Sequence, residues 1–181
     1  MDYSVNNFLY LKGMWGNMEG RVTQINVKSY YEFSLDKNET GLPKKPVDMA
    51  QVTSYGVGND YNHYRTTSKQ STKDRAVLIY TLDMIEQLNG EGWPINPGDI
   101  GENITIDGLK YDDFKIGDKY QIGEVIVEVT EGCNPCKNLG ALPYVGERVN
   151  EFIKLMENRR GWFVKVISEG NVKVNDLVLP L

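Results

Sequence analysis

Residues 98–139 read GDIGENITIDGLKYDDFKIGDKYQIGEVIVEVTEGCNPCKNL, and this stretch decides the fold. Its first half is a Gly-rich turn, Gly101-Glu102-Asn103, that opens a strand. Its second half alternates apolar and polar residues over 125–129, which is typical of a half-buried strand. That strand runs into Cys133-Asn134-Pro135-Cys136, which contains the only two cysteines of the 181 residues. Strands that end in a polar turn and in a thiol predict a site where several chain ends converge.

Composition and charge limit the possible classes of protein. With 40% apolar and 25% charged residues, the chain has the composition of a soluble globular protein of one domain. Its longest strongly apolar string, Ala76–Tyr80, is too short to span a membrane. A net charge of −5 supplies no basic surface for nucleic acid, although a few arginines suffice to bind a small anionic cofactor. The first residues lack a signal-peptide pattern, so we expect a cytoplasmic protein with two free thiols.

Short strands are predicted on both sides of the quoted stretch. Residues 1–19 are apolar but lack a clear period, so we treat them as an extension before a domain over residues 20–181. Runs typical of strands cover residues 20–28, 47–54, 74–80, 162–167 and 171–178. Together these about eight strands predict a mostly β fold: a closed or nearly closed β-barrel with a few peripheral helices. We expect residues 98–110 and 120–136 to lie beside each other in this barrel.

Two helices and one long loop complete the prediction. The first helix follows Thr81 as its N-cap and has Leu82, Ile85 and Leu88 on its inner face. The second helix has Val149, Phe152, Ile153 and Met156 on one face and is closed by Arg159, Arg160 and Gly161. Residues 55–73 are polar and without period, and a loop of that length in a compact domain is usually either functional or disordered.

Several motifs in a fixed order resemble the MOSC domain family, which is named after the C-terminal part of molybdenum-cofactor sulfurases. They are G-D-x-G-E-N from residue 98, I-G-D from 116, I-G-E-V-x-x-E-V-T from 122, P-C-K-N-L from 135, Gly56–Arg65, Asp74–Val77 and Gly161-Trp162-Phe163. The resemblance covers about residues 20–178 and implies a β-barrel that binds a molybdenum cofactor. One departure is Asn59 at a turn glycine of the family, and asparagine is the residue that best replaces glycine in the left-handed region.

The resemblance assigns molybdenum binding, or the carriage of sulfur, to Cys136. A thiolate is a soft ligand that suits such a metal, and Lys137 and a helical start after Cys136 favour a reactive thiol. The alternative is a small buried apolar side chain. For Cys133, a zinc site lacks the other ligands and a thioredoxin-like pair lacks its βαβ setting. We therefore prefer one functional thiol, Cys136, with Cys133 as its neighbour.

Four further residues are candidates for binding the cofactor. The resemblance places Asn103 and Glu102 toward it, and an amide both donates and accepts hydrogen bonds. The alternative is a turn residue that bonds its own backbone. Arg65 and Arg75 are candidates for the cofactor phosphate, with solvated arginines as the alternative. We expect Cys136, Asn103 and Arg65 or Arg75 to line one cavity.

The resemblance implies two functions, and the residues leave a third open. The first is a molybdoenzyme that reduces an N-hydroxylated small molecule, with Cys136 as the metal ligand. Its electrons come from a donor protein, because the sequence has no flavin or iron–sulfur pattern. The second is a non-catalytic cofactor carrier or sulfur-transfer module with a persulfide on Cys136. The third is a metal-free barrel that binds a small ligand.

Overall fold

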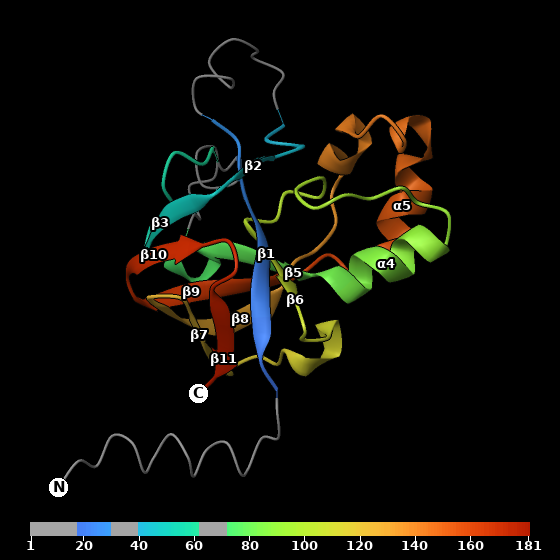
Figure 1. The fold of residues 1–181 in the computed structure, drawn as a ribbon. Helices are drawn as coiled ribbons and strands as arrows, with labels where there is room; N and C mark the ends of the chain where they lie inside the picture. Colours follow the sequence, from blue (N-terminus) through green and yellow to red (C-terminus); the bar gives the residue numbers. More distant parts are fainter. Residues whose placement is uncertain (1–17, 30–39, 62–71) are drawn as a thin grey trace, which may run out of the picture.

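Seven strands close into a barrel and an eighth lengthens its sheet (Figure 1). The computed structural model describes residues 18–29, 40–61 and 72–181. The strands are β1 (Gly20–Val27), β2 (Lys45–Val47), β3 (Met49–Thr53), β4 (Gly56–Val57), β5 (Val77–Thr81), β6 (Ile104–Asp107), β7 (Lys119–Ile122), β8 (Val125–Gly132), β9 (Trp162–Ser168), β10 (Gly170–Lys173) and β11 (Leu177–Pro180). The helices are α4 (Leu82–Gly90), α5 (Val149–Leu155) and the 3₁₀ turns Lys73–Arg75, Tyr111–Asp113, Lys137–Ala141 and Gly146–Arg148.

The barrel follows the order β11-β7-β8-β9-β5-β6-β1, and β11 pairs with β1 to close it. Strand β2 pairs with β1 outside the ring, and β10, β3 and β4 form a separate small sheet. Within the main sheet, β5 and β6 are parallel and the other pairings between described strands are antiparallel. The predicted mostly β barrel with peripheral helices is therefore confirmed.

The predicted pairing inside the barrel is wrong. Residues 98–110 supply β6 and residues 120–136 supply β8, but β9 and β5 stand between these two strands. The reason is that β8 forms a long antiparallel ladder with β9, the next strand along the chain, which follows α5. Strand β5 then pairs with the first residues of β9, which leaves β6 to pair with β5 in parallel.

Two predicted strands are each divided in the structure. The run over 47–54 contributes Val47 to β2 and Met49–Thr53 to β3, which belong to different sheets. The run over 171–178 is divided between β10 and β11 by a turn in which Asn175 has a φ of 74°. The predicted left-handed asparagine at the turn after β4 is confirmed, because Asn59 has a φ of 60°.

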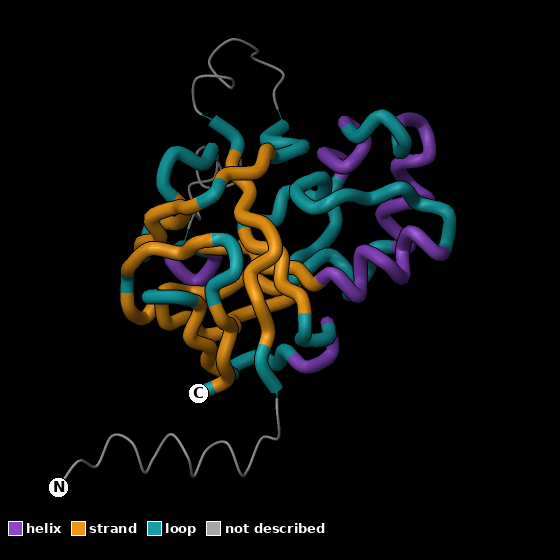
Figure 2. The backbone as a smooth tube through the Cα atoms, viewed as in Figure 1, coloured by secondary structure: helices purple, strands orange, loops and turns teal. Residues whose placement is uncertain are grey.

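Two apolar clusters hold the structure together. The alternating residues of β8 point into the barrel, where Val125, Val127 and Val129 are each 1% exposed. A second cluster joins α4 to α5, which Figure 2 shows together on one side of the strands. Ile85 and Leu88 of α4 and Phe152 of α5 are buried there, as the helical spacing predicts.

The helix ends agree with the prediction only in part. Thr81 occupies the N-cap of α4, but its hydroxyl is buried and makes no hydrogen bond to a described residue. Helix α5 ends at Leu155, so Arg159–Gly161 do not close it. These residues instead lead into β9, which places the Arg160 side chain near Cys136. In the described part of the chain, no helix has the length and apolar character needed to cross a membrane.

Candidate functional site

Cys136 lies on the loop that leaves the end of β8, and its side chain is exposed. It is the N-cap residue of the 3₁₀ turn Lys137–Ala141, and the Leu139 amide donates to its carbonyl over 3.1 Å. Leu139 itself is completely buried in the cluster beneath α4 and α5. The loop is therefore fixed from below by an apolar anchor while its thiol faces solvent. The alternative of a buried apolar Cys136 is wrong.

Arg160 is the residue that links this thiol to the Gly-rich turn. Its Nη1 donates to the Asn134 carbonyl over 2.8 Å and lies 3.9 Å from Cys136 Sγ. Its Nη2 donates to the Ile100 carbonyl over 3.3 Å. The guanidinium therefore bridges the loop before Cys136 and the turn before β6. Arg160 was predicted to close the second helix and not to belong to the site, although its place just before Gly161-Trp162 was the available signal.

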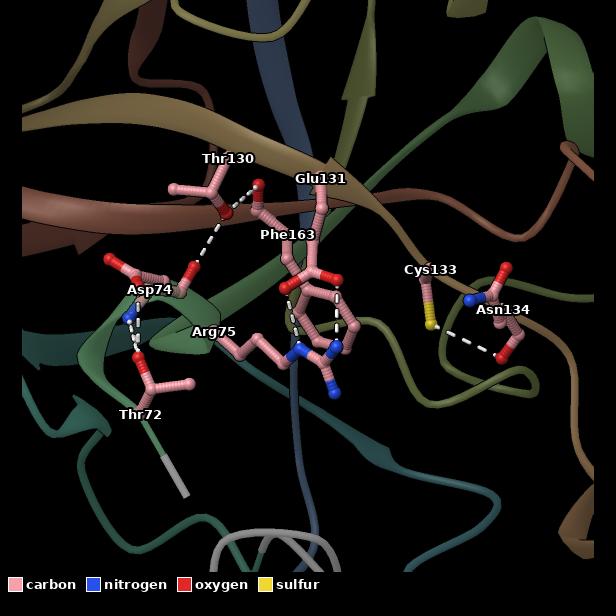
Figure 3. A network of polar contacts seen from close by, with 8 residues as sticks. All are labelled: Thr72, Asp74, Arg75, Thr130, Glu131, Cys133, Asn134 and Phe163. Atoms are coloured by element: carbon pink, nitrogen blue, oxygen red, sulfur yellow. Dashed lines mark hydrogen bonds and ion pairs between the residues drawn. The ribbon is translucent and has the colours of Figure 1, made fainter. Parts of the chain in front are cut away.

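Cys133 differs from Cys136 because it is 5% exposed. Its backbone N–H donates to the Gly161 carbonyl over 2.8 Å, which continues the β8–β9 ladder to this residue. Its thiol points to the Asn134 carbonyl at 3.8 Å (Figure 3). Burial raises the pKa of the Cys133 thiol, and the Arg160 charge opposes that shift only in part. Cys133 is thus a protonated, enclosed neighbour of an accessible thiol.

Asn103 is 2% exposed, and the surrounding backbone uses its amide. Its Oδ1 accepts from the Leu78 N–H of β5 over 3.2 Å, and its Nδ2 donates to the Asn26 carbonyl of β1 over 3.3 Å. The same Nδ2 donates to Asp60 Oδ2 over 2.9 Å. Asp60 also pairs with Lys44 at 2.6 Å. These contacts make Asn103 a link between β1, β5 and the turn after β4.

Glu102 is fully buried. Its Oε1 accepts from the Gly98 N–H over 2.5 Å and from the Thr105 hydroxyl over 3.1 Å. Its Oε2 is buried and has no hydrogen-bond partner among the described residues. Burial raises the pKa of Glu102, and the two bonds at Oε1 offset the shift only partly. Glu102 therefore shapes the turn from inside.

Arg75, one of the two arginines predicted to bind the cofactor phosphate, forms an ion pair with Glu131 of β8. Its Nε and Nη2 bind the two carboxylate oxygens at 2.6 and 2.7 Å, and its guanidinium lies 5.4 Å from the centre of the Phe163 ring (Figure 3). The bidentate pair uses the geometry that would also recognise a phosphate. Arg75 therefore has to share or exchange Glu131 to bind one. Arg65 lies outside the described residues.

The predicted residues divide into two places. Through Arg160, the structure brings Cys136 to the turn that contains Glu102 and Asn103, while Arg75 lies near Cys133 on the β8 side. A common cavity for Cys136, Asn103 and the arginines stays a prediction. Among the described residues, no group of three or more His, Cys, Asp or Glu side chains has an arrangement that could hold a metal ion. A metal at this site would therefore need most of its ligands from a cofactor.

Comparisons with known proteins agree with this fold. The chain is 28% identical to the uncharacterized protein YflK of Bacillus subtilis over 145 residues, which are 78% of this chain and 63% of YflK. It is 28% identical over 110 residues to a protein named "Reductase" from Gibberella moniliformis, covering 58% of this chain and 19% of that protein. Both relatives thus extend well beyond the matched region.

A solved structure and a family model complete the comparison. The structure of YiiM from Geobacillus stearothermophilus superimposes with a TM-score of 0.66 at 23% identity, covering 90% of this chain and 75% of that one. This likeness shows a shared fold. The model of the MOSC domain matches residues 58–179, which include the strands and loops that form the candidate site. The chain therefore belongs to the MOSC domain family.

Proposed function

We propose that this protein binds a molybdenum cofactor with Cys136 as the protein ligand of the metal, and that it reduces N-hydroxylated small molecules. The observation that carries the proposal is the exposed Cys136 thiol on an anchored loop, with Arg160 Nη1 3.9 Å from its sulfur. The chain matches part of a relative named "Reductase", and this match supports a reductive reaction. Membership of the MOSC domain family supports the choice of cofactor.

The donor set of the loop fits such a cofactor. A thiolate is a soft ligand, and one protein ligand is enough when the cofactor itself carries the metal. Arg160 contributes a guanidinium whose Nε is buried without a hydrogen-bond partner among the described residues. A cation beside the thiol suits an anionic, phosphate-bearing group. Bound molybdenum would supply the chemistry that removes oxygen from the N-hydroxyl group, with electrons from a separate donor protein.

The chain's own residues have positioning tasks in this proposal. Leu139 anchors the loop, so the Cys136 sulfur keeps a fixed place relative to the barrel. Arg160 holds the Cys136 loop against the turn at Ile100. Asn103 and Glu102 act through the backbone, because their side chains fix the strand ends that present this turn. The barrel interior is filled by valine, isoleucine and aromatic side chains, so the loop end is the place for a ligand.

The exposure of Cys136 also favours a second function, a carrier or sulfur-transfer module. A persulfide on an exposed thiol is accessible to an acceptor protein, which takes the outer sulfur and leaves the Cys136 thiolate behind. The two functions predict different results when the purified protein is given a substrate. Turnover of a hydroxylamine with a supplied reductant supports the reductase, whereas cofactor or sulfur release without turnover supports the carrier.

The proposal is tested by the metal and pterin content of protein from a host that makes the cofactor. We expect molybdenum and pterin in wild-type protein and in Cys133→Ser, and neither in Cys136→Ser. Cys133→Ser is the matched control because it removes a thiol three residues away. Full retention in Cys136→Ser would remove the thiol from the mechanism. Protein without molybdenum or pterin in any variant would favour the metal-free ligand-binding barrel.

A further inference from the structure

Arg160 differs from the other arginines near the site in the partners that it uses. Arg75 pairs with Glu131, and Arg159 pairs with Glu91 at 2.6 Å. Arg160 contacts two backbone carbonyls and a thiol, and it takes part in no ion pair with a described residue. A carbonyl stabilises a guanidinium without cancelling its charge. The positive charge of Arg160 therefore remains available beside Cys136.

The place of this charge is fixed. Bonds to the Asn134 and Ile100 carbonyls hold the guanidinium from two directions, and its Nε is enclosed. Nη1 faces Cys136 Sγ at 3.9 Å, and the thiol is exposed. Any group that approaches the sulfur from solvent thus comes within a few ångströms of a cation that two carbonyls hold in place. At such a distance the attraction between unit charges changes an equilibrium about fivefold even in water.

We propose that Arg160 is a specificity-determining residue that makes the Cys136 site select negatively charged groups, of which oxyanions such as phosphate or an oxo-metal anion match its geometry. A guanidinium has more donors than the two that the carbonyls use, and it binds oxyanions better than an ammonium does. The inference deepens the proposed function but does not depend on a bound cofactor. It concerns the charge preference of the thiol site in the chain alone.

The test compares two alkylating reagents of similar size in the metal-free full-length protein. Iodoacetate is an anion and iodoacetamide is neutral; in both reactions the Cys136 sulfur displaces iodide and forms a carbon–sulfur bond. Peptide mass mapping gives the rate at Cys136 alone. We expect the ratio of the iodoacetate rate to the iodoacetamide rate to fall about three- to fivefold in Arg160→Gln. Arg160→Lys keeps the charge and should keep most of the ratio.

Two control variants remove equal charges nearby. Arg159→Gln removes a charge that Glu91 already pairs, and the ratio should change by less than about 1.5-fold. Lys137→Gln removes the exposed charge adjacent to Cys136, and its effect should be smaller than that of Arg160→Gln because the ammonium is mobile and solvated. An unchanged ratio in Arg160→Gln, or an equal fall in Arg159→Gln, overturns the inference.

One further measurement keeps the test decisive. If Arg160→Gln fails to fold, the ratio is followed in Lys137→Gln as salt rises from 10 mM to 1 M. A falling ratio supports a nearby fixed cation, and a flat one overturns the inference. A changed ratio in a protein that holds no cofactor in its native host would leave this inference standing while the proposed function fails.

Discussion

Replacing Asn103 with alanine should destabilise the protein even when no cofactor is present. The change removes the acceptor of the Leu78 N–H in β5 and the donor to the Asn26 carbonyl in β1. It also removes the donor to Asp60, which belongs to a buried ion pair with Lys44. Because Asn103 is 2% exposed, water cannot easily replace these bonds. Asn103→Ala is therefore a test of whether this residue serves the fold.

The magnitude follows from the three bonds. Two neutral hydrogen bonds contribute about 1 kcal/mol each, and the bond to the charged Asp60 contributes about 2 kcal/mol. The expected loss in the free energy of unfolding is therefore about 4 kcal/mol. For a domain of this size each kcal/mol lowers the melting temperature by about 2–4 °C, so we expect a fall of about 8–16 °C.

The assay is thermal unfolding of cofactor-free protein, followed by circular dichroism. The control is Asn96→Ala, which removes an exposed amide whose side-chain bond to Asp99 is 3.4 Å long, and it should change the melting temperature by less than about 2 °C. A fall of less than about 2 °C in Asn103→Ala would refute the reasoning, because it would mean that the three bonds contribute little. Asn103 would then be better explained as a ligand-binding residue.

Two more predictions concern the thiols and Glu102. Limiting iodoacetamide should label Cys136 well before Cys133, because Cys133 is 5% exposed and burial raises its pKa; mass mapping checks this, and equal labelling would contradict it. The pKa of Glu102 is raised in the folded protein above its ordinary value of 4.5. The folded state therefore binds the proton more tightly than the unfolded state, and this group's contribution to stability is full below that value and falls as pH rises toward the folded pKa. The melting temperature of Glu102→Gln should therefore rise relative to that of wild type as pH increases from 5 to 8. A constant difference would show that folding does not raise the pKa of Glu102.

Local patterns were sufficient to predict the kind of fold. The period of two over 125–129 and the continuous apolar run of β5 correspond to a strand with one buried face and a strand that is buried along its whole length. The order of the strands was not predictable in the same way. A strand pattern says which face is buried and not which partner it takes, so β9 and β5 between β8 and β6 could only be found in the structure.

The candidate site shows the same limit at the level of single residues. The exposed Cys136 and the enclosed Cys133 carry the same chemical group, and their difference arises from the ladder that extends to Cys133 and stops before Cys136. Arg160 was assigned to a helix end because basic residues are common there. Its place just before Gly161-Trp162 marked it, but its bridge to Ile100, sixty residues earlier in the chain, is a contact that no local pattern specifies.

At this site, the hydrogen bonds of each polar residue show whether its side chain serves the fold or is available for chemistry. Both donor positions of the Asn103 amide and its oxygen are already engaged, so a ligand there would have to displace a strand contact. The Cys136 thiol makes no bond to a strand, and Arg160 bonds only the carbonyls of two loop residues, Asn134 and Ile100, through its two terminal nitrogens. Loss of Asn103 should therefore lower stability with or without a ligand. Loss of Cys136 or Arg160 should change binding and reactivity while leaving the barrel intact.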